Sequence, residues 1–161
     1  MAQEIERKFL VDAQAWNSTE KPAGAVFRQG YLVTDPQKTI RVRLTPGKAF
    51  LTIKGLTTGV TRPEFEYEIP VTEATELLNR FAVTELSKTR YTLPFAGKIW
   101  EVDVFSGTNT GLIVAEIELD SEDEVFALPG WVTLEVTGDA RYYNANLALH
   151  PYTLWSQDLS S

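Results

Sequence analysis

Charged and apolar residues alternate along most of the segments of this chain that can form β-strands. The first such segment, EIERKFL, places Glu4, Glu6 and Lys8 on one face of a strand. Ile5 falls between them on the opposite face. The same two-residue period recurs in pairs of like charge, which are Arg41 and Arg43, Lys88 and Arg90, Glu101 and Asp103, and Glu116 and Glu118. The pattern predicts strands with one apolar face and one strongly ionic face.

Turn residues and apolar periodicity divide the chain into about eight strands and two longer helices. Residues 39–55 are expected to form a hairpin with its turn at Pro46-Gly47. Helices are expected over residues 72–81, capped by Thr72, and over residues 139–149, with a shorter helix after Asp12. Many strands joined by turns, with few helices, indicate an antiparallel α+β fold.

Length and composition narrow the classes of function. A chain of 161 residues without a repeat or linker indicates a single domain, 1–161. The net charge of −7 argues against broad binding to nucleic acid or to an acidic membrane. There is no cysteine and only one histidine, His150, so any metal must be bound by oxygen ligands. The chain is charged from Glu4 onward and no apolar run has the length of a membrane span, so we expect a cytoplasmic protein.

Periodicity alone does not decide whether the ionic faces point inward or outward. A two-layer β protein with its charges in solvent gives the same alternation. Two features favour a binding site. The ionic positions recur on strand after strand, and acidic and basic pairs lie on different strands, as a site for both a metal and a phosphate requires.

The ordered set of charged motifs resembles the CYTH, or triphosphate tunnel metalloenzyme, superfamily. The motifs in chain order are Glu4-x-Glu6-x-Lys8, Arg41-x-Arg43, Lys54, Lys88-x-Arg90, Glu101-x-Asp103 and Glu116-x-Glu118. The stretches FRQGYL and LPGWVTLEVTGDARYYNANLAL also look like bacterial members, and the resemblance covers essentially the whole chain. It implies an α+β fold with an eight-stranded antiparallel β-barrel (a tunnel) and a few helices packed outside. The charged faces then point inward, and the apolar faces meet the helices and the partner in a homodimer.

The resemblance also implies a metal-dependent hydrolase that cleaves the terminal phosphate of inorganic triphosphate with magnesium or manganese. The residues implied on the metal side are Glu4, Glu6, Asp103, Glu116 and Glu118. Those implied to bind substrate phosphates are Lys8, Arg41, Arg43, Lys54, Lys88 and Arg90, with Arg28 and Tyr31 as further candidates at the tunnel mouth. Glu4, Glu6, Lys54 and Lys88 are the expected catalytic set, in which one lysine stabilises or protonates the leaving oxygen. Glu64 and Glu66 are expected to pair with tunnel arginines rather than with metal.

Three other functions remain open at this point. A class IV-type adenylate cyclase, which converts ATP to cyclic AMP, needs an adenine pocket that no sequence feature clearly supplies. A thiamine triphosphatase needs an aromatic platform, for which Trp16, Phe27 and Tyr31 are candidates. A polyphosphate-binding module without catalysis would not require the acidic pairs. The charged motifs recognise phosphates and do not identify what is attached to them.

Overall fold

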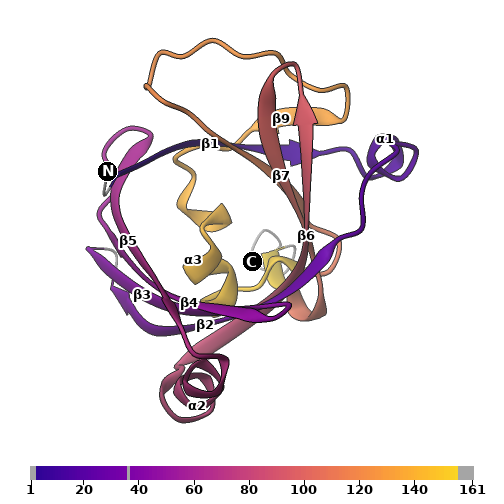
Figure 1. Cartoon of the computed structure of the whole chain (residues 1–161). Helices are drawn as coiled ribbons and strands as arrows, with labels where there is room; N and C mark the ends of the chain where they lie inside the picture. The colour runs from indigo at the N-terminus through magenta and orange to yellow at the C-terminus, as the bar shows by residue number, and fades with distance from the viewer. Residues whose placement is uncertain (1–2, 36, 156–161) are drawn as a thin grey trace.

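The computed structural model, which describes residues 3–35 and 37–155, is built on a closed antiparallel β-barrel (Figure 1). Its strands are β1 (Gln3–Val11), β2 (Ala25–Asp35), β3 (Lys38–Thr45), β4 (Lys48–Gly55), β5 (Thr61–Ile69), β6 (Thr84–Phe95), β7 (Lys98–Phe105) and β8 (Ile113–Glu118). They follow the order β5-β4-β3-β2-β6-β7-β8-β1, and pairing of β5 with β1 closes the ring. The predicted eight-stranded barrel is therefore confirmed.

The first strand has three pairing partners. Along one edge, residues 6–10 pair with β8, from Glu6↔Glu118 to Leu10↔Val114. Its other edge is shared: residues 3–5 pair with β5, and residues 9–11 pair with a short ninth strand, β9 (Val132–Glu135). The chain therefore closes the barrel through the strand that comes first in its sequence.

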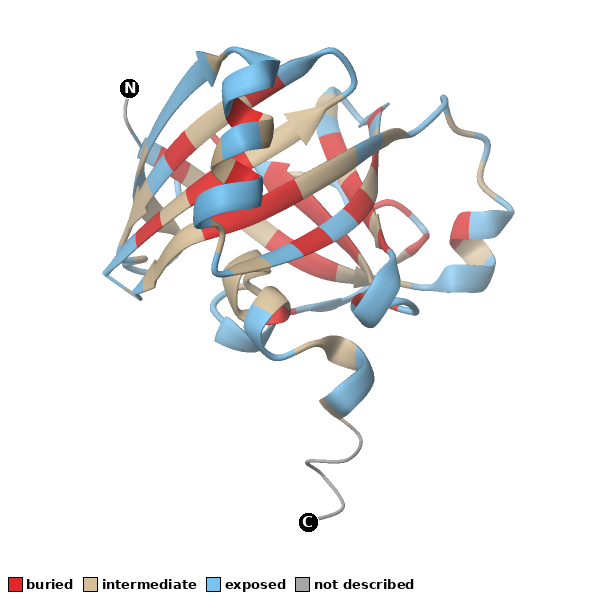
Figure 2. Ribbon diagram, turned by 90° about the horizontal axis from the view of Figure 1, so that it is seen from below, coloured by how far each residue is buried: buried red, intermediate tan, exposed pale blue. Residues whose placement is uncertain are grey.

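Helix α2 (Val71–Phe81) packs on the outside of the barrel (Figure 2). Ala74 and Leu78 are buried against Val42 and Ala49 of the sheet. A Cβ on Gly30 would lie 2.3 Å from Leu78 Cδ2, so only glycine lets the helix approach this closely. The helix begins after Pro70 and has no side-chain cap, so the predicted cap at Thr72 is wrong, because the chain turns into the helix directly after the strand-ending proline.

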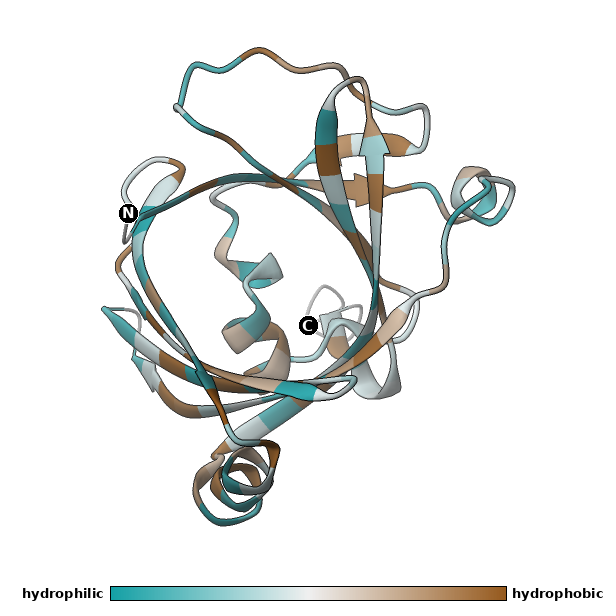
Figure 3. Ribbon diagram, viewed as in Figure 1, coloured by the Kyte–Doolittle hydropathy of each residue, from teal (hydrophilic) through white to brown (hydrophobic). Residues whose placement is uncertain are grey.

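An aromatic core covers another part of the outer face. Trp100, which is fully buried, packs edge-on against Trp131 with ring centroids 5.8 Å apart. Trp16 reaches the same cluster from α1 (Ala13–Asn17), which is the short helix expected after Asp12. Asp12 caps this helix, because its Oδ2 accepts a hydrogen bond from Ala15 N at 2.8 Å. Figure 3 shows hydrophobic and hydrophilic residues alternating along the strands, so the face opposite these clusters is the polar one.

The C-terminal segment lies across one end of the barrel, and in the view of Figure 1 α3 projects over the opening of the ring of strands. It comprises η2 (Ala140–Tyr142), α3 (Asn144–Leu149) and η3 (Tyr152–Leu154). The prediction of one helix over 139–149 is wrong, because Tyr143 has an extended backbone (ψ 135°) that divides it. The break lets the Tyr142 carbonyl accept a hydrogen bond from Lys8 Nζ at 3.3 Å. Unlike α2, α3 thus contacts the barrel interior.

No helix in residues 3–35 and 37–155 is both long enough and apolar enough to cross a membrane.

Candidate active site in the barrel interior

Acidic and basic side chains occupy opposite halves of the barrel wall. The neighbouring strands β5, β1, β8 and β7 carry the acidic motifs, and β6, β3 and β4 carry most of the basic ones. The register places Glu6 opposite Glu118 and Lys54 opposite Glu64. The ionic faces therefore point inward, as the family resemblance implies, and the segregation seen in sequence becomes a segregation across one cavity.

The central cavity has a volume of about 190 Å³ and a lining of charged side chains. We call it the charged compartment. Its lining residues are Glu4, Glu6, Glu64, Glu66, Glu101, Glu116, Glu118, Arg41, Arg43, Lys54, Arg90 and Asn144. Eight of the predicted site residues line it, which are Glu4, Glu6, Arg41, Arg43, Lys54, Arg90, Glu116 and Glu118.

The carboxylates of the charged compartment carry more negative charge than the neighbouring cations balance. Burial, together with the charges of Glu116 and Glu4, raises the pKa of Glu6 to about 8. Burial also raises the pKa of Glu4, although Lys54 opposes the rise. The pKa of Glu116 is instead well below its ordinary value, because Lys8 and Arg90 outweigh the effect of burial.

Lys54 occupies the space between two acidic strands. Its Nζ lies 3.1 Å from a carboxylate oxygen of Glu4 and 3.1 Å from one of Glu64. Within the described ranges, no three acidic or histidine side chains converge closely enough to hold a metal ion. The donors nevertheless fit a hard divalent cation in kind, because all are carboxylate oxygens, and those of Glu4 and Glu116 are balanced by the side chains of Lys54, Lys8 and Arg90. A cation held by Glu4, Glu6, Glu116 and Glu118 would replace Lys54 at Glu4 and would draw these carboxylates closer together.

Asp103 is engaged by cations rather than open to the cavity. Its Oδ1 accepts from Arg90 Nε at 2.7 Å, and its Oδ2 accepts from Lys88 Nζ at 2.6 Å and from Arg90 Nη2 at 2.9 Å. Burial alone would raise the pKa of Asp103, but Arg90 and Lys88 lower it to about 2. In this structure Asp103 therefore anchors two cations, and its expected place on the metal side stays a prediction.

Lys88 lies behind the cavity wall and lines no cavity described here. Its side chain is fully buried, and Nζ also reaches Asn144 Oδ1 at 3.4 Å. Burial lowers the pKa of Lys88 to about 7; Asp103 opposes the shift, and Arg90 and Arg43 add to it. Of the two lysines expected in catalysis, Lys54 is therefore the one whose side chain faces the cavity.

Strand β2 separates two further candidates. Tyr31 is buried on its inner face, where the hydroxyl accepts from Gln29 Nε2 at 3.2 Å. Arg28 lies on the outer face, where its guanidinium contacts Glu85 at 2.7 Å and Asn79 of α2 at 3.3 Å. The prediction of Arg28 at the tunnel mouth is wrong, because alternation along β2 directs it away from the interior.

Phe27 shares the inner face with Tyr31. The guanidinium carbons of Arg43 and Arg90 lie 5.0 and 5.2 Å from the centroid of its ring. Sequence reasoning considered Phe27 as a platform for an organic group, whereas its ring is in contact with two of the phosphate-binding candidates. Phe27 lies four residues before Tyr31 on β2, so the two-residue period of a strand could have placed both side chains on the same, inner face.

Glu66 and Glu64 both pair with cations. Glu66 Oε2 lies 3.6 Å from Arg41 Nη2, which confirms the expected arginine pair. Glu64 pairs with Lys54 instead of an arginine. Both glutamates therefore help to set the position of cavity cations.

A second cavity, of about 330 Å³, adjoins the first. It lies between the C-terminal segment and the connection from β4 to β5, and we call it the capped compartment. Its lining is Glu6, Lys8, Tyr31, Thr34, Thr39, Arg41, Lys54, Leu56, Thr57, Gly59, Val60, Arg62, Thr137, Gly138, Ala140, Tyr143, Asn144, Ala145 and Asn146. Sequence reasoning missed Arg62, although it lies two residues before Glu64 and shares its strand face.

A closed antiparallel barrel with ionic residues of both signs inside defines a class of protein. The model of the CYTH domain family matches residues 2–152, and the chain belongs to this family.

Two curated relatives carry one name. The chain is 49% identical over 153 residues to an inorganic triphosphatase of Acetivibrio thermocellus, covering 94% of this chain and 97% of that protein. It is 40% identical over 152 residues to an inorganic triphosphatase of Nitrosomonas europaea, covering 91% and 97%. The crystal structure of an inorganic triphosphatase superposes with a TM-score of 0.62 at 36% identity, covering 91% of this chain and 97% of that one.

Proposed function

We propose that the protein is an inorganic triphosphatase that hydrolyses the terminal phosphate of inorganic triphosphate inside the barrel. The observation that carries the proposal is the charged compartment, in which an acidic half-wall faces a basic half-wall across one cavity. The relatives at 49% and 40% identity, which bear this name, support it. A linear anion that carries metal ions needs both kinds of wall at once.

CYTH triphosphatases depend on a metal ion in general, and we propose magnesium or manganese here. Glu4, Glu6, Glu116 and Glu118 would hold it, since their carboxylates line one side of the charged compartment. When bound, such an ion neutralises charge on phosphate oxygens and lowers the pKa of a coordinated water.

The basic half-wall positions the substrate. Arg41, Arg43 and Arg90 line the charged compartment, and their planar guanidinium groups suit paired contacts to phosphate oxygens. Asp103 fixes Arg90 through two hydrogen bonds, so this arginine is held in place before the substrate arrives. Phosphoryl transfer depends mainly on such positioning and on charge neutralisation.

The acidic half-wall and Lys54 act on the reacting atoms. A water oxygen attacks the terminal phosphorus, the bond from that phosphorus to the bridging oxygen breaks, and the products are phosphate and diphosphate. A carboxylate of the acidic half-wall that does not hold the metal ion accepts the proton of the attacking water. Lys54 Nζ stabilises the leaving oxygen, because its side chain lines both compartments while Lys88 lines neither.

The test is phosphate release from tripolyphosphate with magnesium or manganese, beside ATP and thiamine triphosphate. Rapid release from tripolyphosphate, lost in Glu4→Gln and kept in the exposed-surface control Glu76→Gln, supports the proposal. Cyclic AMP from ATP without phosphate release from tripolyphosphate would replace it by the cyclase function. Tight binding of tripolyphosphate without turnover would leave a polyphosphate-binding module.

A further inference from the structure

Arg62 is an inward-facing cation that has no partner among the described residues. It lies on the face of β5 that carries Glu64 and Glu66, and it lines the capped compartment. Within residues 3–35 and 37–155 its side chain makes no ion pair or hydrogen bond, and its Nε is buried without an acceptor. A buried donor without an acceptor is unfavourable unless a ligand supplies one.

The other interior cations of the described residues have a partner for their charge or their other donors, although the Nε of Arg41 is also buried without an acceptor. Five of them lie within 3.6 Å of a carboxylate oxygen, and these are Lys8, Arg41, Lys54, Lys88 and Arg90. Arg43, which lines the charged compartment, donates to Gln29 Oε1 at 2.8 Å. Arg62 is thus the interior cation whose charge is least committed to the protein itself in the part of the chain described.

The capped compartment favours an anion. Its lining holds the cations Lys8, Arg41, Lys54 and Arg62 but only one carboxylate, Glu6. The charged compartment has seven carboxylates, so the two cavities differ in the sign of their excess charge. Glu6, Arg41, Lys54 and Asn144 line both, and an extended anion can therefore pass from one into the other.

We propose that Arg62 binds the phosphate of the substrate that enters the capped compartment, and that it thereby selects linear chains of at least three phosphates over diphosphate. This inference rests on the proposed function, because it assigns one terminal phosphate of the triphosphate substrate to the capped compartment. Diphosphate held between the two half-walls of the charged compartment makes no contact with Arg62. Release of the shortened product follows from the loss of that contact.

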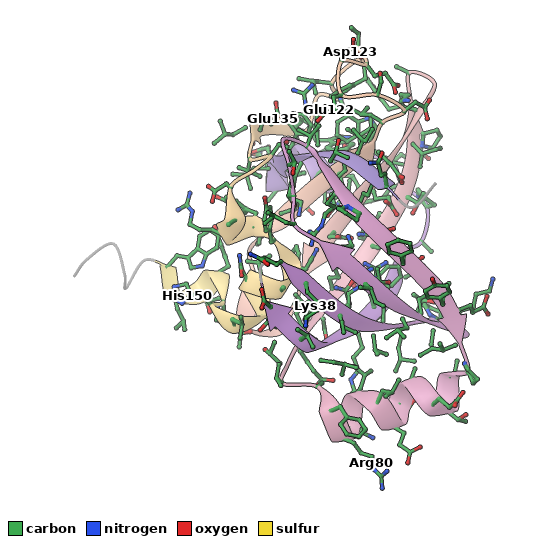
Figure 4. All side chains as sticks on the ribbon, turned by 90° about the vertical axis from the view of Figure 1, so that its left-hand side faces the viewer. Lys38, Arg80, Glu122, Asp123, Glu135 and His150 are labelled. Carbon is green, nitrogen blue, oxygen red and sulfur yellow. The ribbon has the colours of Figure 1, made fainter. Side chains whose placement is uncertain are left out.

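The variants that test this inference are Arg62→Gln, Arg62→Lys and the matched control Arg80→Gln. Arg80 lies on α2, is exposed, and points away from the barrel (Figure 4). Binding of tripolyphosphate and of diphosphate is measured by titration calorimetry in a metal chelator, so the result does not depend on turnover. We expect Arg62→Gln to weaken tripolyphosphate binding about 10-fold to 100-fold, the range for one charge-assisted hydrogen-bond pair.

The affinity for diphosphate should stay within about twofold in Arg62→Gln, and Arg80→Gln should change neither affinity. Arg62→Lys should recover part of the loss, because it keeps the charge but not the planar fork. If the chelated protein binds neither anion, the same comparison uses the KM for tripolyphosphate and the inhibition constant of diphosphate in magnesium. Circular dichroism identifies a variant that does not fold, in which case Arg62→Lys alone is compared.

Equal weakening of both anions would overturn the selection by chain length, and unchanged tripolyphosphate binding would overturn the contact itself. The wild-type turnover assay separates this inference from the proposed function. A wild type that binds tripolyphosphate through Arg62 but releases no phosphate contradicts the triphosphatase proposal and retains the site.

Discussion

The two faces of the barrel strands have the same sequence period but hold the molecule together in different ways. On the outer face, Trp100 and Leu78 pack in clusters of buried apolar side chains. On the inner face, Glu6 lies beside Glu4 and Glu116, and burial together with the charges of these two residues raises its pKa to about 8. The comparison teaches that the outer clusters supply stability by packing, as does a third cluster around Tyr31 and Leu147 inside the barrel, whereas the charged compartment stores unbalanced charge that a ligand can relieve.

The largest effect should come from removing one inner carboxylate. Glu6→Gln is expected to lower triphosphate turnover by about 10²-fold to 10⁴-fold, because it removes one carboxylate of the set that would hold the metal ion. The free energy of unfolding should stay equal or rise, since a repelling charge is gone. Phosphate release and urea unfolding on the same preparation measure both. A loss of stability that parallels the loss of turnover would contradict the division between the two faces.

The outer face should respond in the opposite way. Trp100→Ala is expected to lower the free energy of unfolding by about 3–5 kcal/mol, because it empties a site enclosed by Phe9, Phe126 and Trp131. Phe81→Ala, at an exposed position of α2, is the control and should change stability by less than about 0.5 kcal/mol. Chemical denaturation measures both, and equal costs for the two would remove the packing argument.

The inner charges also predict how stability depends on pH. Glu6 binds its proton more tightly when folded, so its stabilising contribution is complete below its ordinary pKa of 4.5 and is lost as pH rises through about 8. Metal-free protein should therefore lose on the order of 2–3 kcal/mol of unfolding free energy between pH 5 and pH 8 relative to Glu6→Gln. Urea titrations at several pH values in a chelator give this difference. Parallel curves of unfolding free energy against pH for the two proteins would show that folding does not raise the pKa of the Glu6 carboxyl.

A smaller effect sharpens the description of the outer face at the contact of α2 with β2. Gly30→Ala should cost about 1–3 kcal/mol, because the new Cβ meets Leu78 Cδ2. In a Leu78→Ala background the same substitution should cost less, and a double-mutant cycle measures the difference. If the costs of Gly30→Ala and Leu78→Ala simply add in the double mutant, the strain does not arise from contact between the new Cβ and Leu78.

Much of this arrangement is encoded in local patterns. Alternation predicted the strands, and the ordered motifs predicted the barrel and most of the cavity lining. Arg28 was misplaced because a strand period assigns two faces but does not say which one is inside. Gly30 carries that information only through its contact with α2, which is distant in sequence.

Asp103 and Arg62 show a second limit. The type of a residue indicates what it can bind, but its partners depend on the three-dimensional register of other strands. Asp103 faces Arg90 across β6 and β7, so its cationic partners depend on a register that the sequence of β7 alone does not give. Arg62 begins an inward-facing Arg-x-Glu-x-Glu series, in which the sequence alone suggested a role for the two glutamates and none for the arginine.

The three partners of β1 have a consequence for how the chain is made. β1 precedes the other strands in the sequence, and it is completed on one edge by β8 and on the other by β5 and β9. Its pairing with residues 114–118 and 132–135 must wait until those residues, more than 100 positions further along the chain, have been synthesised. Such long-range pairing slows folding. The alternating charges along EIERKFL therefore have a second consequence. While the edges of this strand are unpaired, its charged side chains disfavour pairing with strands of other chains.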